Sequence, residues 1–449
     1  MEKYGTYIKS KRRQTTMNGF DPGELPSFLY DFQEKVTRWE LEKGRGAIFA
    51  DCGLGKTPMA LAWADKVLKK TNKPILSITP LAVSHQTVRE GEKFGIECRV
   101  TKTGDVHAGI NVTNYHRLHY YNPDDFGGVI LDESGILKNF AGKVRQQITE
   151  FMNSTEFRLL CTATPAPNDH MELGTSSEAL GELRRVEMLS MFFIHDAAKT
   201  QQWRLKKHAI DKFWEWMAGW CRAFRKPSDL GFDDTMFILP KMHMTQHTVK
   251  STPMPGNLLV TEAIGLNEQR AARRASIAQR VEVVAELANN STRPFIAWCD
   301  LNDESTALAK AIPDAVEVRG SQTDDYKERT MIDFSDGNIR VLVTKAKIAG
   351  HGMNWQHCSD MSYFPSHSHE AFYQSSRRIW RFGQKREVNC HMVTSEAETN
   401  VLANMQRKEA IAIEMFKGLV RHMRKFQVNE TNRAEYLANI KQEIPSWLK

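Results

Sequence analysis

The sequence lacks the marks of several classes of protein. Its seven cysteines are scattered without a C-x-x-C pair, which argues against a disulfide framework and against a standard zinc module. No apolar run approaches the ~18–20 residues that a membrane-spanning helix needs. The first residues, MEKYGTYIKSKRR, lack the apolar core of a signal peptide, and there is no internal repeat or low-complexity tract. These absences predict a cytoplasmic protein that does not enter a membrane.

Length and composition are those of a globular chain with two or three domains. The chain has 449 residues, of which 41% are hydrophobic and 26% charged. Its formal net charge of +7 is mildly basic. Such a charge allows a polyanionic partner but does not demonstrate one.

Short apolar runs alternate with helical patterns, which is typical of α/β proteins with parallel sheets. The expected strands form two series, which predicts two α/β lobes. Between them, residues 175–240 are rich in aromatic and basic residues at helical spacing, and we expect their tryptophans to lie on buried helix faces and not to stack on bases. The strands are expected at residues 46–50, 74–79, 128–132, 157–163, 294–299, 315–320, 340–344 and 388–393.

The stretch ADCGLGKT, residues 50–57, has the spacing of a phosphate-binding loop. Gly53 and Gly55 let the backbone curl so that successive N–H groups can hold an anion. Lys56 would then reach the β- and γ-phosphates of a nucleotide, and Thr57 would offer its hydroxyl to Mg²⁺. Ala50 stands where the strict pattern has glycine, so the match is to the looser A-x-x-G-x-G-K-T form common in helicases.

A carboxylate pair follows the strand expected at residues 128–132. Asp132 could hold Mg²⁺ through water, and Glu133 could act as the base that polarises the attacking water. Thr162 and Thr164 follow the next strand, where their hydroxyls could simply cap a turn.

In order and spacing, these motifs resemble those of helicase superfamily two ATPases. The nearest likeness is to the Swi/Snf-type DNA translocases, and in particular to the compact DEAD/DEAH-like forms encoded by bacteriophages, although the family's usual DEMGLGKT is altered here. The resemblance covers residues 29–399 and implies that Thr162 and Thr164 couple hydrolysis to the nucleic-acid groove. It also implies ATP and Mg²⁺ as cofactors and an ATP site made of Gln33, which would read the adenine, with Gly53, Leu54, Gly55, Lys56 and Thr57.

Two further groups of residues take their roles from the resemblance. QSSRRIWRFGQ, residues 374–384, resembles motif VI, QAIGRAHRIGQ, which implies catalytic roles for Gln374, Arg378 and Arg381 and puts Arg377 in a glycine position. A structural ion pair is the rival interpretation of each arginine. Motifs Ia, Ib and V imply DNA-backbone contacts by Thr79, Pro80, Thr113, Asn114, Thr344 and Lys345.

The expected architecture is therefore α/β, with two RecA-like parallel-sheet lobes. A basic N-terminal arm (1–27) precedes lobe 1 (28–174). A helical insertion and linker (175–240) leads to lobe 2 (241–395), and C-terminal helices (396–449) follow. Because the arginines of motif VI and Lys56 lie on different lobes, hydrolysis would require the lobes to close.

The sequence predicts an ATP-dependent double-stranded DNA translocase that remodels protein–DNA or branched DNA, in a bacterial or phage-infected cell. One alternative is a strand-separating helicase acting on forked DNA or RNA. Another is a nucleic-acid-binding adaptor whose ATPase is vestigial, against which the intact Lys56, Asp132, Glu133 and Arg381 argue.

Overall fold

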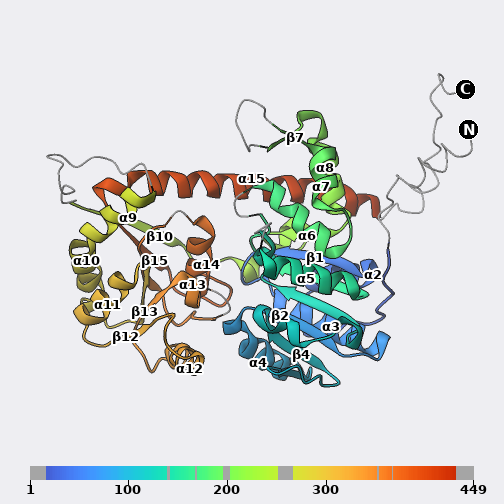
Figure 1. The fold of residues 1–449 in the computed structure, drawn as a ribbon, viewed down its shortest axis with the longest axis horizontal. Coiled ribbons are helices and arrows are strands. Elements are labelled where there is room, and N and C mark those ends of the chain that lie inside the picture. Colours follow the sequence, from blue (N-terminus) through green and yellow to red (C-terminus); the bar gives the residue numbers. More distant parts are fainter. Residues whose placement is uncertain are drawn as a thin grey trace, which may run out of the picture.

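Two parallel sheets form two lobes that lie side by side, the first at the right and the second at the left of Figure 1. The computed structural model describes residues 17–138, 142–166, 169–195, 203–250, 266–350, 353–366 and 368–430. The outer parts of the expected N-terminal arm and C-terminal region therefore lie outside the described residues. The two-lobed α/β architecture predicted from the sequence is confirmed.

The sheet of the first lobe has seven strands, all parallel. In the strand β1 (Arg45–Ala50), Ala47 and Phe49 belong to one hydrophobic cluster, while Ile48 and Ala50 belong to another. Both faces are thus buried, which explains why residues 46–50 form an apolar run and do not alternate with polar residues. In spatial order the strands are β3 (Cys98–Val100), β4 (Ile110–Asn114), β2 (Ile75–Thr79), β5 (Gly128–Asp132), β6 (Phe157–Thr162), β1 (Arg45–Ala50) and β9 (Cys221–Phe224).

Helices cover both faces of this sheet (Figure 1). Of these, α3 begins directly at the glycine loop, where Gly55 is its N-cap at φ 80°, and it ends at Asn72, which takes the left-handed conformation. The helices are α2 (Asp31–Lys43), α3 (Lys56–Thr71), α4 (Ser84–Phe94), α5 (Lys143–Ser154), α6 (Leu173–Leu180), α7 (Arg185–Phe192) and α8 (Ile210–Ala218).

The second lobe repeats the plan with a sheet of six parallel strands. In order these are β10 (Met242–Val249), β15 (Val388–Ser395), β14 (Asp360–Tyr363), β11 (Phe295–Cys299), β13 (Val341–Lys345) and β12 (Ala315–Val318). Its helices are α9 (Leu266–Ala275), α10 (Ile277–Asn289), α11 (Asn302–Ala311), α12 (Asp324–Ser335), α13 (Ala346–Ala349) and α14 (His369–Ile379).

The stretch expected to be a helical insertion is only partly helical. It contains the antiparallel pair β7 (Phe193–His195) and β8 (Trp203–Leu205), and β9 pairs with β1 in the sheet of the first lobe. The expectation of a purely helical segment is therefore wrong for these strands. The apolar pattern did not reveal β9 because the strand contains the charged residue Arg222. In the fold this side chain is buried, and its guanidinium carbon lies 3.4 Å from the centroid of the Trp39 ring. The buried Trp214 and Trp220 confirm that the aromatic residues belong to the core.

A single helix, α15 (Thr399–Glu430), links the two lobes along the top of Figure 1. Met405 belongs to a core cluster of the second lobe, whereas Phe416 and Leu419 belong to a core cluster of the first. At Gly418 an added Cβ would lie 2.9 Å from the Trp214 ring, so glycine allows the close contact with α8. One continuous helix thus covers residues 399–430 of the expected C-terminal helical region, and residues 431–449 lie outside the described part of the chain.

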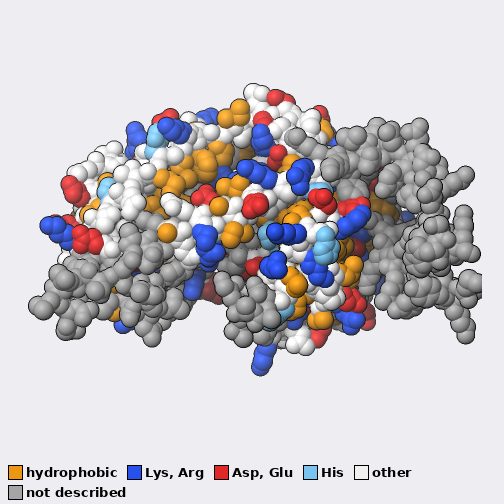
Figure 2. Space-filling view, turned by 90° about the horizontal axis from the view of Figure 1, so that it is seen from above, with side chains coloured by type: hydrophobic (Ala, Val, Ile, Leu, Met, Phe, Trp, Pro, Cys, Tyr) orange, Lys and Arg blue, Asp and Glu red, His pale blue; other side chains and the backbone are white. Residues whose placement is uncertain are grey.

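Figure 2 shows this upper face, where Lys and Arg side chains are mixed with acidic and hydrophobic ones. All seven cysteines are free thiols, as the scattered spacing predicted. Among the described helices, none has the length and apolar character required to cross a bilayer.

Candidate functional site

The glycine loop after β1 has the curled backbone that its sequence predicted. Gly53 and Gly55 have φ values of 86° and 80°, in the region that favours glycine. The Lys56 Nζ donates to the carbonyl oxygens of Ala50 at 2.9 Å and Asp51 at 3.3 Å, so the ammonium group spans the loop. This arrangement offers backbone N–H groups, a cation and a helix N-terminus to one anion.

Gln33 packs directly against this loop from the start of α2. Its Nε2 donates to the Leu54 carbonyl at 3.0 Å, and its Oε1 accepts from the Tyr30 N–H at 3.1 Å. A Cβ on Gly55 would lie 2.2 Å from the same Nε2, so the contact requires glycine there. Leu54 contributes its carbonyl oxygen while its side chain is buried. Gln33 thus joins the predicted adenine position to the phosphate loop.

The carboxylate pair at the end of β5 is held in an unusual turn. Glu133 has φ 49°, a left-handed conformation that costs a non-glycine residue ~1–3 kcal/mol and is characteristic of functional sites. The Glu133 N–H donates to Asp132 Oδ1 at 3.0 Å, and the Tyr115 hydroxyl donates to the Asp132 carbonyl at 2.6 Å. The turn is therefore fixed from within and by Tyr115, the first residue after β4.

Thr162 lies where the sequence placed a coupling residue. Its Oγ1 donates to Glu133 Oε2 at 3.4 Å and accepts from the Thr164 N–H at 3.1 Å. The Thr162 hydroxyl therefore connects the backbone of Thr164 to the carboxylate of Glu133, so a shift of Thr164 can move that carboxylate. Whether this contact couples hydrolysis to nucleic acid stays a prediction.

The donor set of the acid turn fits Mg²⁺. Asp132 and Thr57 line the same cavity and offer a carboxylate and a hydroxyl, the hard oxygen ligands that Mg²⁺ prefers. Burial, and then the charge of Glu133, raise the pKa of Asp132 to about 7, although Lys56 lowers it. Asp132 is therefore poised between its protonated and ionised forms at neutral pH.

This pKa predicts a pH-dependent affinity for Mg²⁺. Because the metal binds the ionised carboxylate, protons compete with it as the pH falls through about 7. We expect the Mg²⁺ concentration for half-saturation, measured calorimetrically with a non-hydrolysable ATP analogue, to rise about tenfold per pH unit below that value. The Asp132→Asn variant should bind Mg²⁺ weakly, and its affinity for Mg²⁺ should no longer depend on pH through this carboxylate. If the Mg²⁺ affinity of the variant depends on pH as that of the wild-type chain does, the titrating group belongs to the nucleotide and not to Asp132.

Arg378 and Arg381 come from the second lobe and have no carboxylate partner among the residues that the structure describes. Their Nη1 atoms donate to the Met353 carbonyl at 3.3 Å and 3.5 Å. The Nε of Arg381 is buried without a partner, while the rest of its side chain is partly exposed to the cleft. Burial, followed by the charge of Arg378, lowers the pKa of Arg381 to about 10, so it remains a cation at neutral pH. These contacts argue against structural ion pairs.

Gln374 does not line the cleft with them. Its Oε1 accepts from Arg378 Nη2 at 3.1 Å, and it is 2% exposed. The direct catalytic role expected from motif VI therefore does not fit its position. In this structure Gln374 orients the Arg378 guanidinium through this hydrogen bond and does not line the cleft itself.

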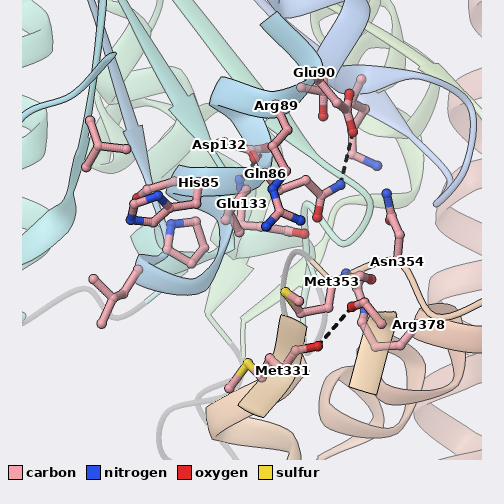
Figure 3. A pocket seen from close by; sticks show the side chains of 18 of the residues that line it. His85, Gln86, Arg89, Glu90, Asp132, Glu133, Met331, Met353, Asn354 and Arg378 are labelled. Atoms are coloured by element: carbon pink, nitrogen blue, oxygen red, sulfur yellow. Dashed lines mark hydrogen bonds between the residues drawn. The ribbon is translucent and has the colours of Figure 1, made fainter. Parts of the chain in front are cut away.

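The nucleotide residues and the arginines share one cavity of about 1040 Å³ between the lobes. In Figure 3, Asp132 and Glu133 face it from the first lobe, and Arg378 and Asn354 from the second. Because a small-molecule site typically occupies ~300–1,000 Å³, the cleft has room beyond one nucleotide. It is lined by Gln33, Gly53, Gly55, Lys56, Thr57, Asp132, Glu133, Arg378 and Arg381, among others.

Three of the expected DNA contacts are buried. Thr79 and Thr344 are 0% exposed and donate their hydroxyls to protein oxygens, such as Val318 O for Thr344 at 3.1 Å. Thr113 is 1% exposed, and its hydroxyl is buried without a partner. Direct phosphate contact by these three residues therefore does not fit the structure. The expectation assumed that polar groups at strand ends are exposed, and here they are buried.

The other expected DNA contacts have different positions. Pro80 and Asn114 line the cleft, and Asn114 Oδ1 caps the following turn by accepting from the His116 N–H at 3.1 Å. Lys345 is partly exposed at the end of β13. Sequence reasoning missed the longer cations that line the same cleft from both lobes: Arg89, Lys93, Lys102, Arg117, Lys327 and Lys347.

Comparisons with known proteins give one local match in sequence and several similar solved structures. No family model matches the chain. It is 25% identical over 197 residues to the CHD3-type chromatin-remodeling factor CHR7 of Arabidopsis thaliana, a match that covers 37% of this chain and 16% of that protein. The chain thus spans a small part of that relative's length.

Solved structures show similarity across most of the chain. The structure of S. cerevisiae Dbp5 bound to RNA and ADP BeF3 has a TM-score of 0.57 at 13% identity, covering 87% of this chain and 93% of that chain. The Sulfolobus solfataricus SWI2/SNF2 ATPase core in complex with dsDNA is 18% identical, covers 90% of this chain and 96% of that chain, and has a TM-score of 0.42. The chain therefore shares the two-lobed, RecA-like fold of the Dbp5 structure.

Proposed function

We propose that this protein is an ATP- and Mg²⁺-dependent translocase acting on double-stranded or branched DNA. One observation carries the proposal: the phosphate loop, the acid turn and two arginines without carboxylate partners among the described residues line one cleft from both lobes. A structural core would pair such arginines with carboxylates, whereas a γ-phosphate would supply the missing charge.

Each residue then has a defined role. Lys56 and the loop N–H groups bind the β- and γ-phosphates. Thr57 and Asp132 would hold Mg²⁺, which would neutralise phosphate charge. Glu133 accepts a proton from the attacking water, and Thr162 holds its carboxylate. Arg378 and Arg381 approach the γ-phosphate from the second lobe, so closure of the cleft assembles the site.

The cations that line the cleft support a nucleic-acid partner. Arg89 and Arg117 belong to the first lobe and Lys347 to the second, so each lobe can grip a phosphate backbone. Because backbone contacts carry no sequence information, binding should be nearly independent of sequence and weaken steeply with salt. Alternating grip by two lobes that open and close would move the chain along its track.

The preference for a DNA duplex rests on the motifs. The Swi/Snf-like pattern of residues 374–384 and the local match to a chromatin-remodeling factor favour duplex DNA. The resemblance to Dbp5, whose structure contains RNA, favours the rival, a strand-separating helicase acting on forked DNA or RNA. Lys56, Glu133 and Arg381 lining one cleft argue against the other rival, an adaptor with a vestigial ATPase.

The deciding experiment is the ATPase rate with duplex DNA, single-stranded DNA, forked DNA and RNA at matched nucleotide concentration. We expect duplex DNA to stimulate the rate at least as well as single strands. We also expect displacement of a third strand from a triplex with little unwinding of a blunt duplex. Robust unwinding of long duplexes, or stimulation by RNA alone, would establish the helicase instead. A chain that no nucleic acid stimulates would be the adaptor.

A further inference from the structure

A buried carboxylate in the phosphate loop receives its partners from both lobes. The Asp51 Oδ2 lies 3.0 Å from the Arg377 Nη2, and its Oδ1 accepts hydrogen bonds from the Tyr373 hydroxyl and from the Cys52 N–H at 2.6 Å. Arg377 and Tyr373 belong to α14 of the second lobe. Arg225, just after β9 of the first lobe, lies 3.7 Å from the same Oδ2. The side chains of Asp51 and Arg377 are only 9% and 7% exposed.

The arginine in this pair is itself fixed in place. Its guanidinium carbon lies 4.4 Å from the centroid of the Trp380 ring, and the Trp380 Nε1 donates to the Pro240 carbonyl at 2.7 Å. The loop backbone also touches the second lobe, because a Cβ on Gly53 would lie 2.7 Å from the Phe382 nitrogen. Arg377 and Phe382 flank the segment that carries Arg378 and Arg381. The phosphate loop therefore contacts both ends of that segment.

Asp51 does not face the nucleotide. It lines a second cavity of about 630 Å³, together with Arg225, Arg377 and Trp380, and it is absent from the lining of the main cleft. Burial raises the pKa of Asp51, but Arg377, Tyr373 and Arg225 together lower it further, so the carboxylate is ionised at neutral pH. It can act on hydrolysis only through the groups that it holds.

We propose that Asp51 is a positioning residue, which anchors α14 to the phosphate loop through Arg377 and Tyr373 and thereby aims Arg378 and Arg381 at the γ-phosphate. The inference rests on the proposed ATPase function and adds to it an interlobe contact that exists only when the cleft is closed. When the lobes separate, water can solvate both charges. When Asp51 alone is removed, the buried Arg377 is left without its carboxylate partner.

The test compares Asp51→Asn, Arg377→Met and the double variant with the wild-type chain. Asp51→Asn should lower the DNA-stimulated kcat at least about tenfold while changing KM for ATP less than about threefold, because Lys56 still binds the nucleotide. The double variant should be no slower than the worse single variant, since both remove one contact. Asp51→Glu, which keeps the charge, should retain more activity than Asp51→Asn. Small-angle scattering of the nucleotide-free chain should show a larger radius of gyration for Asp51→Asn.

Glu328→Gln is the matched control. Glu328 also forms an interlobe pair, with His85 at 3.2 Å, but both side chains are about a third or more exposed, at 37% and 44%. Such a solvated pair contributes little, so this variant should keep the wild-type kcat and radius of gyration. An equal loss in Glu328→Gln would show that any interlobe contact suffices and would overturn the assignment to Asp51.

Two further outcomes distinguish this inference from the proposed function. Additive losses in the double variant, or an unchanged radius of gyration in Asp51→Asn, would overturn the anchor even if the chain hydrolyses ATP. If the wild-type chain hydrolyses no ATP with any nucleic acid, the proposed function fails, and the scattering comparison still tests the anchor. Where Asp51→Asn does not fold, as judged by its melting transition, Arg377→Met carries the same comparison.

Discussion

The Glu133→Gln variant is expected to bind ATP like the wild-type chain and to lose turnover by about 10²–10⁴-fold, the usual contribution of a general base. Glutamine keeps the shape of the side chain and its contact with Thr162, but it cannot accept the proton of the attacking water. The strained turn at φ 49° holds this carboxylate at the cleft. Single-turnover hydrolysis and the affinity for a fluorescent ATP analogue measure the two steps separately.

Two further variants are compared with Glu133→Gln, one that should also lose nucleotide binding and one control that should lose neither function. Lys56→Ala should weaken nucleotide binding as well as turnover, because it removes a charge on the phosphates themselves. Glu92→Gln, on the exposed side of α4, should behave like wild type. Turnover near the wild-type rate in Glu133→Gln would mean that the acid pair has been misassigned.

Two strands that sequence analysis missed contain polar residues that are satisfied by hydrogen bonds within the lobe. In β4, the buried Asn111 donates its side-chain amide to the carbonyls of His107 at 2.8 Å and Gly109 at 3.3 Å. In β14, Asp360 accepts from the Asn389 amide at 2.8 Å. Apolar runs cannot reveal such strands, since hydrogen bonds replace apolar contacts there. Expected strands such as β5 and β11, in contrast, are almost entirely apolar and buried, and this pattern located them.

The motifs located the chemistry but not its supports. Lys56, Asp132 and Glu133 were found from short spacings, because each follows the end of a buried strand. Tyr373 and Asp51 are 322 positions apart, and no local pattern joins them. The same holds for Lys138, which forms an ion pair with Glu370 of α14.

Buried threonines show the opposite error. Thr79 and Thr344 were expected to contact phosphates because small polar residues at strand ends suit that role. In the fold their hydroxyls close hydrogen bonds within the lobe, to Pro80 O at 3.2 Å and Val318 O at 3.1 Å. Hydroxyl groups can serve either purpose, and only the burial of the strand end decides between them. Long cations such as Arg117 can still reach a backbone from the same edge.

Arg381→Ala should reduce turnover by about 10³-fold or more, the range of an arginine that neutralises a transferring phosphate. Arg381 has no carboxylate partner in the described part of the chain, and its Nε is buried without a partner. Its removal therefore breaks no ion pair, and the melting temperature should stay the same or rise, because an uncompensated charge leaves the site. Binding of duplex DNA without nucleotide should be largely intact.

Arg381→Lys sharpens this prediction. Lysine keeps the charge but lacks the planar fork that can donate two hydrogen bonds to phosphate oxygens, so it should recover only a small part of the lost turnover. Arg386→Ala is the matched control, because Arg386 follows in the same loop, is exposed, and its guanidinium donates to the His357 carbonyl. It should keep both turnover and stability. The contrary result would be a clear drop in the melting temperature of Arg381→Ala, with turnover reduced only in proportion to the folded fraction. Arg381 would then be a structural residue, and Arg378 alone would act across the cleft.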